Sequence, residues 1–155
     1  MSFRIQGLDP APFLPLFDLS AEELASRGIV RVQSDASPGY PDRIEMRDAA
    51  PGESLLLVNH VHHDVANPYR ASHAIYVRVG AAAPYDAVDA VPESLRRRLL
   101  SVRAFDADGL MVDADVVDGT ALEATIERLF ADPAVAMLHA HYAKRGCYAG
   151  RILRA

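Results

Sequence analysis

The order of elements expected between residues 74 and 142 constrains the fold of this chain more than any other feature. Apolar patterning predicts four strands there, over 74–79, 101–105, 110–116 and 135–142. Pro92 favours the first turn of a helix after the first strand, and an apolar stripe beyond residue 120 predicts a second helix before the last strand. The resulting order, β-α-β-β-α-β, is that of a ferredoxin-like unit.

Local signals in the same region mark where its elements begin and end. Asp106-Ala-Asp-Gly109 is a strong turn sequence, so it predicts a hairpin between its two flanking strands. Thr120 and Glu123 have the spacing of a capping box, which satisfies two free backbone N–H groups at a helix start. Asp132-Pro133 should end that helix, because the residue before a proline disfavours helical backbone.

The first half of the chain predicts a layer of hairpins with one short helix. Strands are expected over 3–7, 29–34, 43–47 and 53–61, the last two as a hairpin around Pro51-Gly52, and a final strand is expected over 147–153. Ser20 can cap the helix, and Gly28 should end it. We therefore predict an α+β protein of mostly antiparallel sheet with two or three helices. A ferredoxin-like core over 74–142 would lie under the N-terminal β-hairpin layer.

Composition narrows the functional classes. The 155 residues match one ordinary domain, 1–155. The 16 Lys and Arg against 21 Asp and Glu argue against a nucleic-acid or acidic-membrane partner, which requires a basic surface. The single cysteine excludes an internal disulfide, and prolines interrupt any signal-like start, so a cytoplasmic protein is expected. The excess of 15 Arg over one Lys, with abundant Ala, indicates a GC-rich bacterial genome.

The histidines form two groups in the sequence, one of His60, His62, His63 and His73 and one of His139 and His141. Two histidines spaced by two on a strand lie on one face, and neutral imidazoles so placed can share a metal ion. If the 53–61 and 135–142 strands were neighbours, both groups would converge, with Asp64 nearby. The alternative is histidines hydrogen-bonded at strand ends or in solvent. Metal binding is therefore kept as an alternative function, and no residue is assigned as a metal ligand.

The only thiol is the candidate for covalent or redox chemistry. Cys147 follows Lys144 and Arg145, and cations beside a thiol favour its thiolate form. His139 or His141, a few residues upstream across a turn, could act as its base. The alternative is a small cysteine buried in the last strand, which is the usual state of a free cysteine.

A second group of residues predicts an anion site. Pro68 and Tyr69 would form a rigid loop that presents Arg70, and a guanidinium binds carboxylate or phosphate in a two-pronged arrangement. Lys144, Arg145 and Tyr148 would complete the site. The alternative is an internal ion pair between Arg70 and one of the 21 acidic residues. Three further arginines, Arg96, Arg97 and Arg98, are interpreted as the solvated face of a short helix.

Several motifs in combination resemble one family. They are Arg47-Asp-Ala-Ala-Pro-Gly-Glu53, Pro68-Tyr69-Arg70, Ser101-Val-Arg-Ala-Phe-Asp106, Val112-Asp-Ala-Asp115, His139-Ala-His141 and Arg145-Gly-Cys-Tyr148. The family is number 1203 among bacterial domains of unknown function, and its members are small single-domain proteins with no assigned activity. The resemblance favours as site residues His62, Arg70, His139, His141, Arg145, Cys147 and Tyr148. The chain departs from the family pattern at Asp42, His60 and His63, which puts a His60-based metal site in doubt.

The sequence thus predicts a polar pocket near the end of the 135–142 strand that binds or processes a small anionic molecule. In an enzyme, Cys147 would be the nucleophile or redox thiol, His139 or His141 the base, and Arg70 with Arg145 the anion holder. In a binding protein the same pocket would only bind. A third class is a structural homodimer that packs through its central apolar strand. No cofactor is indicated, and the sequence does not decide between these classes.

Overall fold

The computed structural model describes residues 1–155 and has two antiparallel sheets. The larger sheet has six strands in the order β5-β1-β9-β8-β6-β7, and the smaller has three in the order β2-β3-β4. The strands are β1 (Phe3–Gln6), β2 (Val30–Gln33), β3 (Ser54–His63), β4 (Ala71–Arg78), β5 (Asp86–Val88), β6 (Leu99–Phe105), β7 (Met111–Asp118), β8 (Met137–Tyr142) and β9 (Tyr148–Arg154). The helices are α1 (Ala21–Ser26), α2 (Glu93–Arg96) and α3 (Leu122–Phe130), with 3-10 turns η1 (Leu14–Leu16) and η2 (Gly119–Ala121). The predicted α+β class is confirmed.

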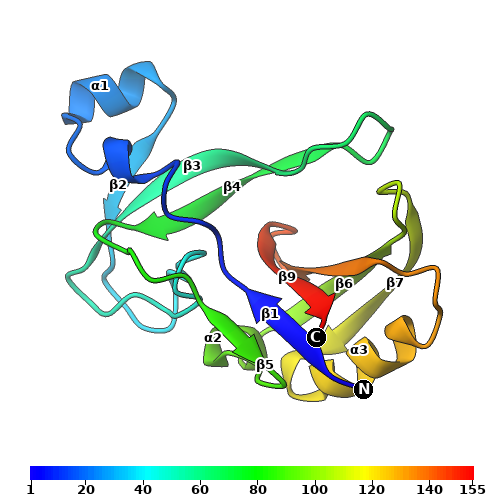
Figure 1. The fold of residues 1–155 in the computed structure, drawn as a ribbon. Helices are drawn as coiled ribbons and strands as arrows, with labels where there is room; N and C mark the ends of the chain where they lie inside the picture. The colour runs from blue at the N-terminus through cyan, green and yellow to red at the C-terminus, as the bar shows by residue number, and fades with distance from the viewer.

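The main core lies on one face of the six-stranded sheet. Alternate residues of β6 and β8 enter it, and α3 covers it with its apolar stripe (Figure 1). The packed side chains include Leu100, Val102 and Ala104 of β6, Leu138 and Ala140 of β8, and Leu122, Ile126 and Leu129 of α3. Because side chains alternate along a strand, the same register directs His139 and His141 to the opposite face.

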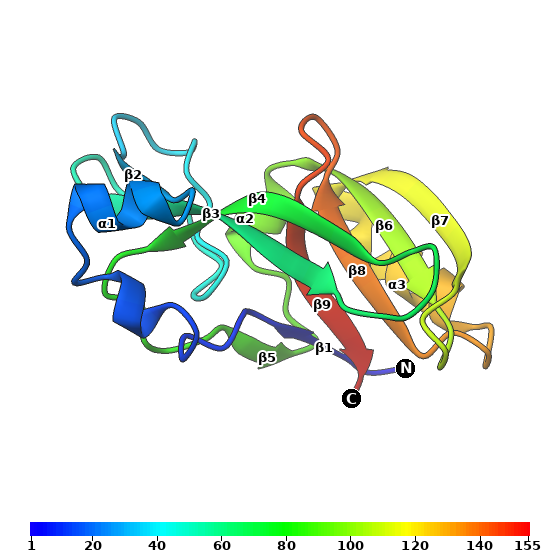
Figure 2. The same cartoon turned by 90° about the horizontal axis from the view of Figure 1, so that it is seen from above.

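The β3–β4 hairpin extends across that opposite face (Figures 1 and 2). Its register pairs Val58 with Ile75, and these residues belong to a second buried cluster that also holds Tyr148 of β9. Two residues further along, the register pairs His60 with His73. The alternation that buries Val58 and Ile75 therefore turns these histidines toward the six-stranded sheet as well.

The ferredoxin-like topology predicted for 74–142 is not the observed one. The strand expected over 74–79 corresponds to β4, which pairs with β3 in the small sheet, whereas β6, β7 and β8 belong to the large sheet. The hairpin predicted over 43–47 and 53–61 is also absent. Residues 43–47 form no strand, and β3 pairs with β2 and β4 instead.

Most of the local predictions agree with the structure. Ser20 caps α1 in a capping box with Glu23, and β6 and β7 form the expected hairpin. The expected capping box at Thr120 does not form, because Asp118 accepts hydrogen bonds from the backbone N–H and the hydroxyl of Thr120 at the start of η2. Helix α3 then begins after Ala121, which makes no side-chain cap.

The helices are all short. None combines the length and the apolar character that crossing a bilayer demands.

Candidate functional site

Four histidines from the two sheets meet in the space between them, and we call them the histidine cluster: His62, His73, His139 and His141. The hairpin supplies the first two and β8 the last two. The ring of His62 is central, with its centroid 4.8 Å from that of His73, 5.0 Å from that of His141 and 5.8 Å from that of His139. Tyr148 stacks on His62 at 4.9 Å and 6°. The side chains therefore form one continuous aromatic group.

The nitrogen atoms of three of these rings converge. His62 Nε2 lies 2.7 Å from His73 Nδ1, and one nitrogen from each of His62, His73 and His141 lies within 4.8 Å of the others. His141 Nδ1 lies 3.0 Å from the Gly146 carbonyl oxygen. A carbonyl only accepts, so Nδ1 carries the proton and Nε2 carries a lone pair. That Nε2 is buried without a partner, as are Nδ1 of His62 and of His139.

Burial keeps the cluster neutral near pH 7. Removal from water lowers the pKa of His139 to about 3 and that of His141 to about 3. Burial, followed by the nearby His73, lowers the pKa of His62 to about 4. The charge of Arg103 contributes in the same direction to the lowered pKa of each of these histidines. Neutral imidazoles are the form that can donate a lone pair to a metal.

The other two histidines lie outside the group of converging nitrogens. His63 Nε2 lies 2.8 Å from the Gly109 carbonyl oxygen, and its ring packs on Phe105 with centroids 4.1 Å apart. His60 lies between Phe13 and Tyr148. The two sequence groups do meet, but β3 and β8 are not neighbours in one sheet. They meet because one sheet is stacked on the other.

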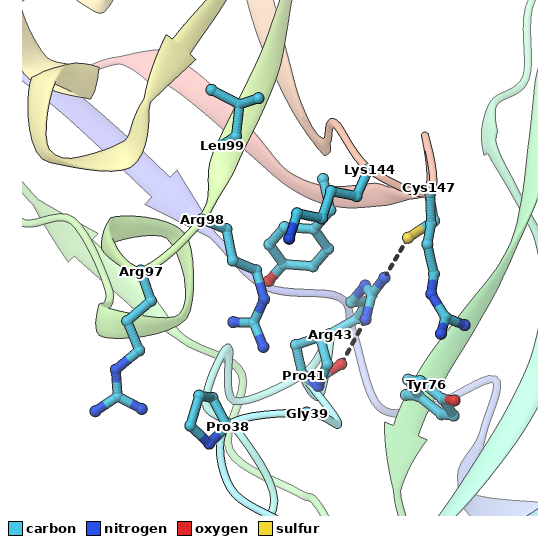
Figure 3. Close-up of a pocket in the computed structure, with 12 residues that line it drawn as sticks. Pro38, Gly39, Pro41, Arg43, Tyr76, Arg97, Arg98, Leu99, Lys144 and Cys147 are labelled. Atoms are coloured by element: carbon cyan, nitrogen blue, oxygen red, sulfur yellow. Dashed lines mark hydrogen bonds between the residues drawn. The ribbon is translucent and has the colours of Figure 1, made fainter.

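Cys147 lies in a separate pocket of 450 Å³, which we call the basic pocket (Figure 3). Five cationic side chains line it, and neither a carboxylate nor a histidine is among its lining residues. The cations come from three segments and are Arg43, Arg97, Arg98, Lys144 and Arg145. The apolar part of the wall includes Tyr142, whose ring lies 4.9 Å from the guanidinium carbon of Arg43 and 5.0 Å from that of Arg98.

Arg43 is the most unusual residue of the basic pocket. It is 1% exposed, and its guanidinium donates to three acceptors, none of which is a carboxylate. These are the Tyr148 carbonyl at 2.8 Å, the Pro41 carbonyl at 2.5 Å and Cys147 Sγ at 3.1 Å. It forms no salt bridge, whereas Arg98 and Arg97 share the buried carboxylate of Asp48 at 2.5 and 3.8 Å. Lys144 and Arg145 are exposed at the rim and also lack a carboxylate partner.

The residues predicted as one site therefore fall into three places. His62, His139, His141 and Tyr148 lie together in and around the histidine cluster, while Cys147 and Arg145 line the basic pocket. Arg70 belongs to neither. It lies in the turn of the hairpin, where its Nε is 3.2 Å from Asp64 Oδ1, both side chains being mostly exposed. Arg70 therefore forms an ion pair within the chain, which was the alternative to an anion site.

Sequence reasoning missed several residues of both sites. Arg43 lies in a segment that was expected to be a hairpin strand, and the residues next to it in the sequence give no signal that its guanidinium is buried. Arg97 and Arg98 were interpreted as a solvated face, but both line the basic pocket, and Arg98 is only 20% exposed. His73 entered the sequence argument only as a member of a group. Its pairing with His60 across the hairpin depends on a register that the sequence did not establish.

Comparison with known proteins places the chain in a family. No curated protein and no solved structure is significantly similar to it. A family model described as "Protein of unknown function (DUF1203)" matches residues 39–154, a span that includes the four histidines of the histidine cluster and the five cationic residues of the basic pocket. Because the match covers well over half of the sequence, the chain belongs to the DUF1203 family.

Proposed function

We propose that this protein binds a small organic anion in the basic pocket. The observation that carries the proposal is the buried guanidinium of Arg43, which lines the pocket and has no carboxylate partner. A buried charge is costly unless an opposite charge or a full set of hydrogen bonds compensates it. The anion would supply that opposite charge.

The distribution of charge supports an anionic ligand. The chain as a whole carries a formal charge of −5, yet five cations line one pocket. Asp48 offsets part of this charge, because it pairs with Arg98 and Arg97. Arg43, Lys144 and Arg145 remain uncompensated. A concave surface with an excess of one sign of charge focuses its field and attracts ligands of the opposite sign.

The shape of the pocket indicates the class of ligand. Its 450 Å³ lies in the range typical of small-molecule sites. Guanidinium groups bind carboxylate and phosphate through paired hydrogen bonds, and Tyr142 and Tyr76 offer apolar surface beside them. The pocket therefore suits a small molecule that carries one or two carboxylates or phosphates on a short carbon skeleton.

Thermal denaturation with inorganic phosphate or citrate tests the proposal. Binding to the native state stabilises it by about 2.7 kcal/mol at a ligand concentration 100-fold above Kd. For a chain of this size that corresponds to a rise in Tm of roughly 5–10 °C. We expect such a rise with at least one of the two anions, measured against sodium chloride at equal ionic strength.

Two matched variants assign the effect to the pocket. Arg145→Gln removes a cation at the rim, and we expect it to reduce the shift in Tm by half or more. Arg27→Gln removes an exposed cation at the end of α1 that is not among the residues lining the pocket, and it should leave the shift unchanged. The proposal fails if neither anion stabilises the protein, or if both variants reduce the shift equally.

Alkylation of Cys147 gives a second, independent measurement. The thiol is partly exposed and lines the pocket, so a bound anion should hinder access of a reagent to it. With saturating citrate, the rate of iodoacetamide modification of the native protein should fall at least threefold. The rate in denaturant, where no pocket exists, should not change. An equal rate for the native protein with and without citrate would contradict binding next to Cys147.

A further inference from the structure

We propose that the histidine cluster is a metal centre in which His62, His73 and His141 bind one divalent first-row transition metal ion, with a fourth position open to solvent or an anion. This site is independent of the basic pocket, because the three ligands are not among the residues that line that pocket. The argument depends on the positions of their nitrogen atoms and on how His141 is held.

The nitrogen positions suit a tetrahedral ion. Two imidazole nitrogens bound to zinc at about 2.0–2.1 Å are separated by about 3.4 Å when the angle between them is tetrahedral. The nitrogens of the three rings lie between 2.7 and 4.8 Å apart, which brackets that separation. In the 2.7 Å hydrogen bond between His62 Nε2 and His73 Nδ1 one of the two nitrogens carries the proton, so metal binding requires that ring to move its proton to its other nitrogen. With that change of tautomer, small rotations of the rings bring three lone pairs to one point.

His141 is oriented as metal-bound histidines usually are. Its Nδ1–H donates to the Gly146 carbonyl, which fixes both the tautomer and the ring plane. This outer hydrogen bond is the common companion of a histidine that binds metal through its other nitrogen. The ring is fully buried in β8, so its free Nε2 points into the cluster from a rigid element.

The unpaired nitrogens point to a missing partner. A buried polar atom with no hydrogen bond costs about 1–3 kcal/mol, so native proteins rarely retain one without a reason. The cluster concentrates all three of the buried side-chain atoms of this chain that lack a partner, on His62, His139 and His141. An ion bound by Nε2 of His141 would remove one of these costs directly.

The donor set indicates which metals fit. Three imidazoles without a carboxylate or thiolate favour zinc, copper, nickel or iron over calcium and magnesium, which require oxygen ligands. Zinc sites with three protein ligands keep an open fourth position for water or substrate. The β6–β8 register pairs Arg103 with His139 and so places an additional positive charge beside the cluster, which makes an anion or hydroxide the expected fourth ligand.

Metal titration of the full chain, expressed without a histidine tag and stripped with a chelator, tests the proposal. We expect one Zn²⁺ per chain, with a Kd of about 1 μM or tighter in competition with a chromophoric chelator. Co²⁺ should bind in place of Zn²⁺ and give the strong visible absorption typical of four-coordinate cobalt. Absence of stoichiometric binding of either ion would overturn the proposal.

Single substitutions assign the ligands. His73→Gln changes a partly exposed side chain, so the variant should fold, and we expect it to weaken Zn²⁺ binding at least tenfold. His141→Gln should weaken binding as much, with the Co²⁺ absorption lost or shifted. His60→Gln is the matched control, since His60 lies opposite His73 on the same face but outside the converging nitrogens, and its affinity should stay within twofold.

The outcomes separate this proposal from that for the basic pocket. Equal affinity in wild-type, His73→Gln and His141→Gln proteins would place the metal elsewhere and overturn the assignment. Loss of binding in His60→Gln as strong as in His73→Gln would do the same. Arg145→Gln should bind Zn²⁺ normally even if it no longer responds to phosphate or citrate.

Discussion

Metal-free protein is expected to lose most of its stability between pH 6.5 and pH 4. Burial lowers the pKa of His139 and of His141 to about 3, from an ordinary value of 6.5. In the unfolded chain both rings take up protons near pH 6.5, whereas in the native protein they stay neutral. The unfolded state therefore binds more protons throughout this window, and the free energy of unfolding falls as the pH falls.

The expected magnitude is large. A ring that remains neutral at pH 4 while its unfolded counterpart is charged lowers the free energy of unfolding by about 3 kcal/mol relative to pH 7. Two such rings remove about 6–7 kcal/mol, which is comparable to the total stability of an ordinary domain. Chelator-treated protein should thus unfold at much lower urea concentration at pH 5 than at pH 7, and should be largely unfolded near pH 4.

The pH range identifies the groups responsible. Hydrogen bonds from Arg47 lower the pKa of Glu53 to about 2. The stabilisation that Glu53 provides is also lost in acid, but only once the pH approaches the ordinary glutamate pKa of 4.5. A change in the urea midpoint between pH 6.5 and pH 5 therefore reports histidines. His139→Asn should show a smaller change over that interval than the wild-type protein. A midpoint that stays constant from pH 7 to pH 5 would contradict buried neutral histidines.

Local structure was predictable from the sequence because its causes are local. The cap of α1 by Ser20 was predicted because it depends only on nearby residues, whereas the capping box expected at Thr120 and Glu123 did not form, because Asp118 holds Thr120. The turn at Asp106–Gly109 forms because Asp106 accepts backbone hydrogen bonds from Asp108 and Leu110. The apolar run that becomes β8 was predicted to be a central strand, and β8 lies between β9 and β6 with five of its six residues buried.

The division of strands between the two sheets was not predictable in the same way. β4 carries the alternating pattern expected of any half-buried strand, and that pattern does not say which strand it will pair with. The ferredoxin-like interpretation assumed that β4 would lie in one sheet with β6, β7 and β8. Its partner is β3, the adjacent strand in the sequence, and the pair forms a long hairpin over the other sheet. The spacing of two places His139 and His141 on one face of β8, but their meeting with His62 and His73 depends on this stacking of the two sheets.

The β8–β9 turn explains why one predicted site became two. Gly146 accepts a hydrogen bond from His141 on one side, and Cys147 accepts one from Arg43 on the other. Tyr148 contributes to both sites, since its ring stacks on His62 while its carbonyl accepts from Arg43. Residues adjacent in sequence therefore face two different sites. Proximity along the chain predicted a single site, but neighbouring residues of this segment contact two separate groups of side chains.

The position of Arg43 also depends on Gly7, whose backbone lies against residues 43–44. A Cβ added at Gly7 would lie 2.0 Å from the carbonyl oxygen of Ile44 and 3.1 Å from that of Arg43. These backbone atoms cannot easily retreat. The Ile44 oxygen accepts from the N–H of Tyr85, and the Arg43 oxygen accepts from that of Leu8, both at 2.8 Å. Gly7→Ala must therefore displace the segment that places Arg43 in the basic pocket.

We expect Gly7→Ala to lower the free energy of unfolding by about 3 kcal/mol or more, with a fall in Tm of roughly 6–12 °C. Gly39→Ala is the control at the rim of the pocket, since its added Cβ meets no atom closer than 3.6 Å and should change stability by less than about 0.5 kcal/mol. Where Gly7→Ala remains folded, its stabilisation by phosphate or citrate should be smaller than that of Gly39→Ala, because Arg43 has moved. Equal urea midpoints for the two variants would contradict this prediction. They would mean that residues 43–44 can move away from the added Cβ without a loss of stability, and that the backbone does not hold Arg43 in place.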